Sequence, residues 1–344
     1  MPNTKKTKKI LISGYYGFDN LGDDLVLEVL VKKLKVMGLN IEVLSGNPEK
    51  TYQSYGVKST FYKSYGSVIS SILNSDILIS GGGSLLQDVT SLKSLLYYLF
   101  VINTALLFGK KVIIFSQGIG PLNNWVGKLL TKLTLQKCQF VSVRDRKSRM
   151  VLSKWNILSE LINDPICDLK LLQTEKKPIV GIQLRNCKNL SNFFIQSLAQ
   201  EVSRSFADKE VEIYSFQDSM DLEVCKNFQS ILRSFNPDIK TTLMSNTSTK
   251  EIVDKISHLE YMIAMRFHAN LLALKYGIKT LAFAYDIKVE KLAQEANIPC
   301  GNLNKSQNFE KLFEQLKNLN SQNLLEYSQS KTFDWEKIEQ AINQ

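Results

Sequence analysis

Short apolar runs alternate with longer amphipathic stretches along most of the chain. The strand-like runs form two series, Ile10–Ile12, Ile41–Leu44, Ile77–Ile79, Val112–Phe115 and Phe140–Val143, then Ile179–Leu184, Val211–Tyr214, Tyr261–Met265 and Thr280–Phe283. Helical spacing is clearest between the first two runs, at Val26, Val29, Leu30, Leu34 and Met37. Strands that alternate with helices are typical of parallel sheets covered on both faces. We therefore predict an α/β protein with two such sheets.

The length of 344 residues suits two domains of ordinary size. The polar stretch Gln173–Pro178 separates the two series of strands, and its proline disfavours a helix before it. We predict a first domain over residues 1–172 and a second over residues 178–325. Residues 326–344 are expected to form a helix that packs back on the first domain, because Trp335, Ile338 and Ile342 have helical apolar spacing.

The composition, 44% hydrophobic and 22% charged, is that of a globular protein. The longest apolar stretch, residues 95–108, is shorter than the roughly 20 residues needed to cross a bilayer. The basic N-terminus is not followed by the apolar core of a secretory signal, so we expect a cytoplasmic protein. The five cysteines lack paired spacing, which argues against a disulfide framework and against a zinc site.

The net charge of +10 favours an acidic partner, for which nucleic acid, an anionic lipid surface and a phosphorylated substrate are the candidates. The lysines are dispersed and lack the interleaved aromatic residues of a single-strand binder. We therefore expect no nucleic-acid partner. An ordinary solvated basic surface explains most of the excess charge.

Three glycine-containing loops follow strand-like runs, at residues 14–24, 80–88 and 116–121. Ligands of open α/β sheets lie beyond the carboxyl ends of the strands, where these loops are placed. Bare glycine backbone allows a ligand to approach closely, although tight-turn chemistry alone also accounts for each loop. The first loop lacks the Gly-x-Gly-x-x-Gly spacing of a dinucleotide site, so a nucleotide-dependent dehydrogenase is not expected.

Cationic side chains also end several of the predicted strands. Arg266 and His268 lie between a strand and a helix start, and the other cations at strand ends are Arg144, Arg185 and Lys288. Guanidinium groups bind carboxylate and phosphate bidentately, which predicts a substrate with several negative charges. A histidine near a strand end is also often only a satisfied polar group.

The motifs together resemble the polysaccharide pyruvyl transferase family, in particular its CsaB-type members. The resemblance rests on residues 14–23, 81–88, 143–148 and 266–269, with further agreement at Asp164-Pro165 and Tyr285-Asp286-x-Lys288. It implies two Rossmann-like domains facing across a cleft, as in GT-B glycosyltransferases. It also implies transfer of pyruvate from phosphoenolpyruvate to a sugar as a cyclic ketal, with release of phosphate.

That reaction assigns roles to the candidate residues. Arg266, Arg185 and His268 are predicted to bind phosphoenolpyruvate, because its carboxylate and phosphate require several cations. His268, Arg144 and Lys288 are the predicted catalytic residues, for proton transfer or for stabilisation of the departing phosphate. The predicted acceptor-side residues are Asp19, Asn20, Asp23, Gly82, Gly83, Gln87 and Asp88, although capping and turn formation explain the aspartates equally well.

Phosphoenolpyruvate is the donor substrate, and we expect neither a metal ion nor another cofactor. The cationic side chains replace a metal ion, and no histidine-carboxylate cluster has the spacing of metal ligands. By the resemblance, the acceptor is a sugar of a cell-wall or surface polysaccharide precursor, lipid-linked in many members. Peripheral contact with the inner membrane face is compatible with the basic charge. Two alternatives stay open, a glycosyltransferase with a nucleotide-sugar donor and a non-catalytic protein that binds anionic saccharides.

Overall fold

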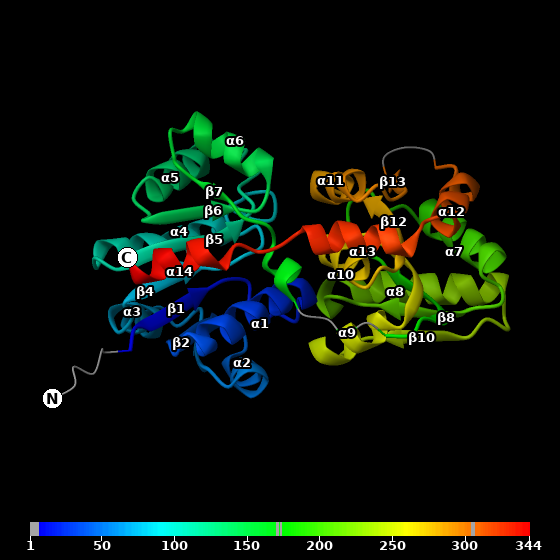
Figure 1. The fold of residues 1–344 in the computed structure, drawn as a ribbon, viewed down its shortest axis with the longest axis horizontal. Coiled ribbons are helices and arrows are strands. Elements are labelled where there is room, and N and C mark those ends of the chain that lie inside the picture. Colours follow the sequence, from blue (N-terminus) through cyan, green and yellow to red (C-terminus); the bar gives the residue numbers. More distant parts are fainter. Residues whose placement is uncertain (1–6, 170–171, 173, 304–306) are drawn as a thin grey trace. The chain divides into compact units, whose positions relative to one another are not determined.

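A computed structural model describes residues 7–169, 172, 174–303 and 307–344 (Figure 1). The chain forms two compact units, Met1–Leu169 with Thr332–Gln344, and Lys170–Lys331. Each unit contains one parallel sheet with helices on its faces, which confirms the predicted α/β architecture. The predicted linker starts at Gln173, outside the described residues, and its last two residues, Lys177 and Pro178, already belong to a strand.

The first sheet has seven parallel strands in the order β3-β2-β1-β4-β5-β6-β7. Their bounds are β1 Lys9–Ser13, β2 Asn40–Ser45, β3 Lys58–Phe61, β4 Ile77–Ser80, β5 Lys111–Gln117, β6 Phe140–Val143 and β7 Glu160–Leu161. Strand β4 is buried throughout, as expected for a central strand covered on both faces. The strand order reverses between β1 and β4, so the loops after these two strands lie together at the switch point.

Helices cover both faces of this sheet. They are α1 Leu21–Val36, α2 Pro48–Tyr55, α3 Tyr65–Leu73, α4 Leu92–Leu107, α5 Trp125–Leu135, α6 Arg146–Lys154, the 3-10 turn η1 Pro165–Asp168, and α14 Trp335–Asn343. Helix α14 returns to this unit from the C-terminal end of the chain (Figure 1). Its Trp335 donates from Nε1 to Asp168 at 2.8 Å, and its ring lies 5.9 Å from that of Phe115 on β5.

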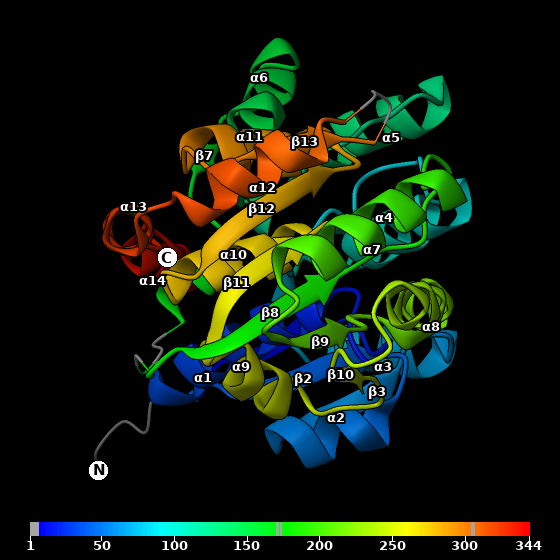
Figure 2. The same cartoon turned by 90° about the vertical axis from the view of Figure 1, so that its right-hand side faces the viewer.

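The second sheet has six parallel strands in the order β10-β9-β8-β11-β12-β13 (Figure 2). Their bounds are β8 Lys177–Gln183, β9 Glu210–Tyr214, β10 Thr241–Met244, β11 Leu259–Ala264, β12 Lys279–Ala284 and β13 Cys300–Asn302. The first strand again lies in the middle, and the order reverses between β8 and β11. The six strands of this sheet therefore have the same order as β1 to β6 of the first sheet, which has β7 in addition at its edge.

The helices of the second unit are α7 Asn192–Ser205, α8 Asp218–Phe235, α9 Thr249–Ser257, α10 Phe267–Lys275, α11 Ile287–Glu295, α12 Phe309–Lys317 and α13 Ser321–Ser330. Helices α7, α8 and α12 share one core cluster with the sheet, whereas α10 contacts α9, α11 and α13. All five cysteines are free. Among the described residues, no helix is long and apolar enough to cross a membrane.

Candidate active site

Neighbouring strands deliver two arginines to the carboxyl edge of the second sheet. Gln183 of β8 is paired in register with Ala264 of β11, so Arg185 and Arg266 emerge side by side two residues further on. The Gln183 side chain strengthens this arrangement, since its Oε1 accepts from the backbone N–H of Arg266 at 2.8 Å. The predicted strand, arginine and helix start at Arg266 are confirmed, because α10 begins at Phe267.

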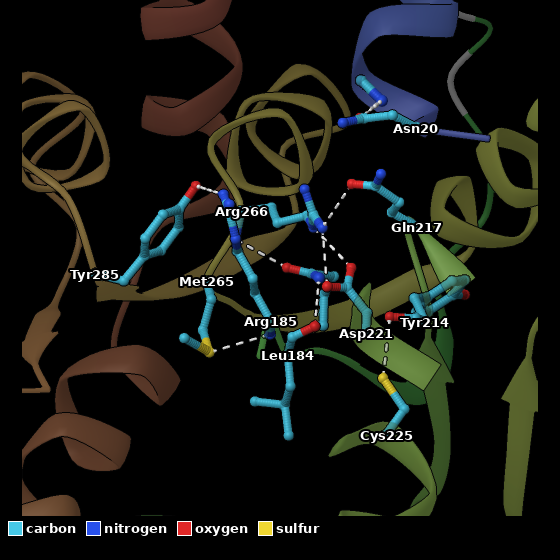
Figure 3. Close-up of polar contacts among 12 residues, drawn as sticks. Asn20, Leu184, Arg185, Tyr214, Gln217, Asp221, Cys225, Met265, Arg266 and Tyr285 are labelled. Atoms are coloured by element: carbon cyan, nitrogen blue, oxygen red, sulfur yellow. Dashed lines mark hydrogen bonds and ion pairs between the residues drawn. The ribbon is translucent and has the colours of Figure 1, made fainter. Parts of the chain in front are cut away.

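Arg266 is buried and forms a two-point ion pair with Asp221 from the first turn of α8 (Figure 3). Its Nε donates to Oδ2 at 2.7 Å, and its Nη2 donates to Oδ1 at 2.8 Å and to Gln217 Oε1 at 3.3 Å. Burial raises the pKa of Asp221, while the guanidiniums of Arg266 and Arg185 act in the opposite direction. The carboxylate largely balances the charge of Arg266.

Arg185 has a different environment, because its closest partner is a phenol. Its Nη1 donates to the Tyr285 hydroxyl at 2.7 Å, and its guanidinium carbon lies 4.6 Å from the centre of the Tyr285 ring (Figure 3). Its Nε is buried and has no hydrogen-bond acceptor in the described part of the chain. Burial raises the pKa of Tyr285, so the phenol is neutral near pH 7. Arg185 thus contributes positive charge and a buried donor, and among the described residues it forms no ion pair of its own, although its charge acts on Asp221.

His268 and Lys288 occupy the first turns of helices that follow adjacent strands. His268 is the second residue of α10, is half-buried, and its ring lies edge-on to that of Phe267 at 5.3 Å. Lys288 is the second residue of α11. Asp286 caps this helix, because its Oδ1 accepts from the backbone N–H groups of Lys288 at 3.0 Å and Val289 at 3.1 Å. The first turn of α10 favours an anion through the helix dipole.

Arg144 belongs to the first unit. It follows β6, and its buried Nη1 donates to Asp164 Oδ2 at 2.5 Å. Its Nη2 donates to Ser84 Oγ at 3.2 Å, which ties the second glycine loop to the start of η1. The four predicted cations therefore end strands as expected, but only Arg185, Arg266 and Lys288 belong to one sheet.

The structure brings several predicted acceptor-side residues together at the switch point of the first sheet. Asn20 caps α1 by accepting from Gly22, and Asp19 accepts from Lys50 at 2.7 Å. Asp23 faces the second glycine loop, because a Cβ atom built on Gly83 would lie 2.7 Å from its Oδ1. The first two glycine loops thus form one surface at this edge.

Protein atoms fill part of the space that the glycines leave. A Cβ on Gly81 would lie 2.1 Å from the Tyr16 hydroxyl, and one on Gly14 would lie 2.2 Å from the same ring. A Cβ on Gly82 would lie 2.7 Å from a methyl carbon of Val26. At these three positions the missing side chain makes room for packing, which corrects the interpretation that bare backbone is left for a ligand.

Gln87 and Asp88 hold loops. The Gln87 side chain donates from Nε2 to Thr90 Oγ1 at 2.7 Å, and its Oε1 accepts from the backbone N–H of Thr90 at 3.0 Å. The Asp88 carboxylate accepts from the backbone N–H groups of Asn123 and Asn124 at 2.9 and 2.6 Å. These contacts favour the structural role for both residues over direct contact with an acceptor.

Sequence reasoning missed Gln217 and Asp221, and it named Tyr285 without giving it a role. A signal existed for the first pair, because both follow the predicted strand Val211–Tyr214 and so lie at the same sheet edge. No sequence signal indicated that Asp221 rather than another carboxylate would meet Arg266. In the described part of the chain, no group of three or more His, Cys, Asp or Glu residues is arranged to hold a metal ion.

Comparison with known families decides the identity of the chain. The family model for polysaccharide pyruvyl transferases matches residues 20–287, which include Arg144, Arg185, Arg266 and His268 and end one residue before Lys288. The chain belongs to the polysaccharide pyruvyl transferase family. Membership makes it a transferase and confirms the predicted family, while the CsaB-type assignment stays a prediction. No individually curated protein matches the sequence.

Solved structures confirm the GT-B-like fold, although their sequences are distant. The UDP-GlcNAc 2-epimerase of Methanocaldococcus jannaschii is 11% identical over 98% of this chain and 99% of its own, with a TM-score of 0.66. A putative UDP-N-acetylglucosamine 2-epimerase from Listeria monocytogenes is 11% identical over 98% and 96%, with a TM-score of 0.64. Anabaena HepE in complex with UDP-glucose is 9% identical over 97% and 98%, also with a TM-score of 0.64.

Proposed function

We propose that this transferase moves pyruvate from phosphoenolpyruvate to two hydroxyls of a sugar as a cyclic ketal and releases phosphate. The observation that carries the proposal is Arg185, whose buried Nε has no acceptor in the described part of the chain and whose guanidinium lies on a neutral phenol. A buried donor and an uncompensated charge are costly unless an anion binds there. Family membership makes a pyruvyl donor the anion to test.

The donor site is assigned to the carboxyl edge of the second sheet. Arg185 and the first turn of α10, which contains His268, provide the positive potential for the carboxylate and phosphate of the donor. Lys288 adds a cation at the end of the neighbouring strand β12. Arg266 has a smaller electrostatic effect, because Asp221 balances it, and it fixes the geometry beside Arg185.

The chemistry requires a proton at C3 of the donor, which makes C2 an oxocarbenium-like electrophile. One sugar hydroxyl adds to C2 and loses its proton, the C2–O bond to phosphate breaks, and a second hydroxyl closes the ketal and loses its proton. Of these two protons, one replaces the proton spent at C3 and the other leaves with phosphate. His268 is our candidate for the proton transfer, and Lys288 is our candidate for neutralising the departing phosphate.

Arg144 is assigned a positioning role. Its buried pair with Asp164 and its bond to Ser84 hold the second glycine loop, beside which Asp23 lies. We place the sugar acceptor at this edge of the first sheet. By family analogy the acceptor is a cell-wall or surface polysaccharide precursor, and neither metal nor another cofactor is needed.

A nucleotide-sugar donor is the second candidate, because HepE, which has the same fold, is known in complex with UDP-glucose. Phosphate release from phosphoenolpyruvate, measured across a panel of sugar acceptors, separates the two. Acceptor-dependent release together with an acid-labile pyruvyl sugar supports the proposal. Turnover of UDP-glucose alone would show that the protein is a glycosyltransferase. Binding of a saccharide without turnover of either donor would show that it is a saccharide-binding protein.

A further inference from the structure

Helix α5 of the first unit has its large apolar side chains on the outside. Trp125, Leu129 and Leu133 follow one another at intervals of four residues and form one stripe, with Val126 and Leu130 beside it. The exposed fractions are 74% for Trp125 and 46% for both Leu129 and Leu133. The helix lies at the outside of its unit (Figure 1).

The side of α5 that faces the protein is formed mainly by small residues, and Leu135 at the C-terminal end of the helix is the one large apolar side chain buried there. Gly127, Thr131 and Thr134 are buried there, and Thr134 Oγ1 accepts from Asn103 of α4 at 2.8 Å. A Cβ on Gly127 would lie 2.9 Å from a methyl group of Leu95, so the glycine allows α5 to lie close to α4. A helix that only covers a sheet has the opposite polarity, with its large apolar residues inside. The exposed face is therefore built for an interaction.

Helix α4 extends this face. Leu92 lies beside Gly127, where a methyl group is 3.4 Å from the position of a Cβ, and it is 38% exposed. Leu96, one turn further along α4, is 42% exposed. We call these seven apolar side chains the α5 patch; they are Leu92, Leu96, Trp125, Val126, Leu129, Leu130 and Leu133.

Most charged side chains near the α5 patch are lysines, and the carboxylate of Asp88 lies at the N-terminal end of α5. Lys128 and Lys132 lie one turn apart at the margin of the apolar stripe. The sequence has no Asp or Glu between Asp88 and Asp145, but it contains Lys93, Lys110, Lys111, Lys128, Lys132 and Lys137. Tryptophan and leucine on one face with lysines beside them are typical of helices that lie in the membrane interface.

We propose that the α5 patch docks on a bilayer rich in anionic phospholipid. The tryptophan and leucines would lie below the headgroups, while the lysines contact lipid phosphates. A second copy of this chain fits less well, because a symmetric contact would bring the lysines of both copies together without carboxylates from this segment. Lipid phosphates supply the negative charge that the segment lacks.

Sedimentation with vesicles tests the proposal on the full chain. We expect binding to vesicles that contain phosphatidylglycerol and weak binding to pure phosphatidylcholine. Leu129→Glu with Leu133→Glu should lower the partition coefficient by about a hundredfold or more, because two inserting side chains are lost. Val36→Glu with Phe193→Glu is the matched control, since these residues are 85% and 78% exposed and the charge change is the same. Both double variants should melt close to the wild type.

Fluorescence reports insertion directly. Of the three tryptophans, only Trp125 is exposed, while Trp155 and Trp335 are 8% and 9% exposed. Anionic vesicles should therefore shift the emission to shorter wavelength, and Trp125→Phe should remove the shift while retaining most of the binding. Lys128→Gln with Lys132→Gln should lower binding about tenfold or more at low salt. Lys188→Gln with Lys226→Gln, at exposed positions of the second unit, should change it little.

Three results would overturn the proposal: no binding to anionic vesicles at low salt, equal losses in the patch pair and the control pair, or no change in tryptophan emission. A dimer that forms without lipid and is lost in the patch pair, with no vesicle binding, would identify a second copy as the partner. The vesicle assay contains neither phosphoenolpyruvate nor sugar. Its failure would leave the proposed transfer reaction intact, and the reverse is also true.

Discussion

The two sheets have six strands in the same order, but their carboxyl edges differ in chemistry. At the first edge, Arg144 is neutralised by Asp164, and the space beside Gly81 is occupied by Tyr16. At the second edge, Asp221 forms its ion pair with Arg266, whereas the hydrogen-bond partner of the Arg185 guanidinium in the described part of the chain is the neutral phenol of Tyr285. Equal topology therefore does not give equal electrostatics. The carboxylate that each guanidinium meets decides whether a strand-end arginine serves packing or ligand binding.

The largest effect is expected from His268→Ala. If His268 transfers the proton, turnover with phosphoenolpyruvate should fall about 10²- to 10⁴-fold, while the melting temperature changes little. The only other histidine, His258, lies at the end of α9 and provides the control. His258→Ala should leave turnover unchanged. Equal activity in wild type and His268→Ala would remove His268 from the mechanism.

The effect of Arg144→Gln on the free energy of unfolding tests the difference between the two sheet edges. The change leaves the Asp164 carboxylate buried without its ion pair, so the free energy of unfolding should fall by about 3–5 kcal/mol. Urea unfolding checks this result. The matched change at the second edge, Arg185→Gln, leaves no carboxylate behind and should cost far less stability. Similar losses in the two variants would contradict the distinction that we draw between these arginines.

Tyr16 and Gly81 test whether packing occupies the first edge. The Tyr16 hydroxyl is buried and has no hydrogen-bond partner in the described part of the chain, so Tyr16→Phe should be neutral or stabilising by about 1 kcal/mol. Gly81→Ala should destabilise by about 1–3 kcal/mol through overpacking against that hydroxyl. Combining the two changes should recover part of this loss. Strict additivity in the thermal denaturation of the double variant would argue against the contact.

The smallest effect is expected from Asp24, in the first turn of α1, on the pH dependence of stability. Burial raises its pKa to about 7, assisted by Asp23 and Asp19 and opposed by Lys50 and the Gly17 N–H. An acid whose pKa is raised on folding holds its proton more tightly in the folded state, so stability falls as the pH rises from about 4 to about 7. Asp24→Asn should remove this dependence and raise the melting temperature at pH 8 by a few degrees. A wild-type melting curve that does not depend on pH in this window would contradict the raised pKa.

The sequence was sufficient to predict the central strands and the positions of the cations. It did not reveal β3, β7, β10 or β13, which are short strands at or near the sheet margins with polar or partly exposed sequences such as Thr241–Met244. Nor did it pair Arg266 with Asp221, because the two lie 45 residues apart and tertiary packing selects the partner. Which cationic residues follow a strand is a local property that can be read from the sequence. Which carboxylate neutralises each of them depends on the fold.

Calorimetric titration with phosphoenolpyruvate tests the central claim most directly, in wild type, Arg185→Gln and Arg204→Gln. Arg204 is a suitable control, because its side chain is 59% exposed on α7 of the same unit. We predict that the wild type and Arg204→Gln bind phosphoenolpyruvate in preference to UDP-glucose, and that Arg185→Gln weakens binding by about thirtyfold or more. Equal affinity in all three proteins, or binding of UDP-glucose alone, would contradict a donor site at the carboxyl edge of the second sheet.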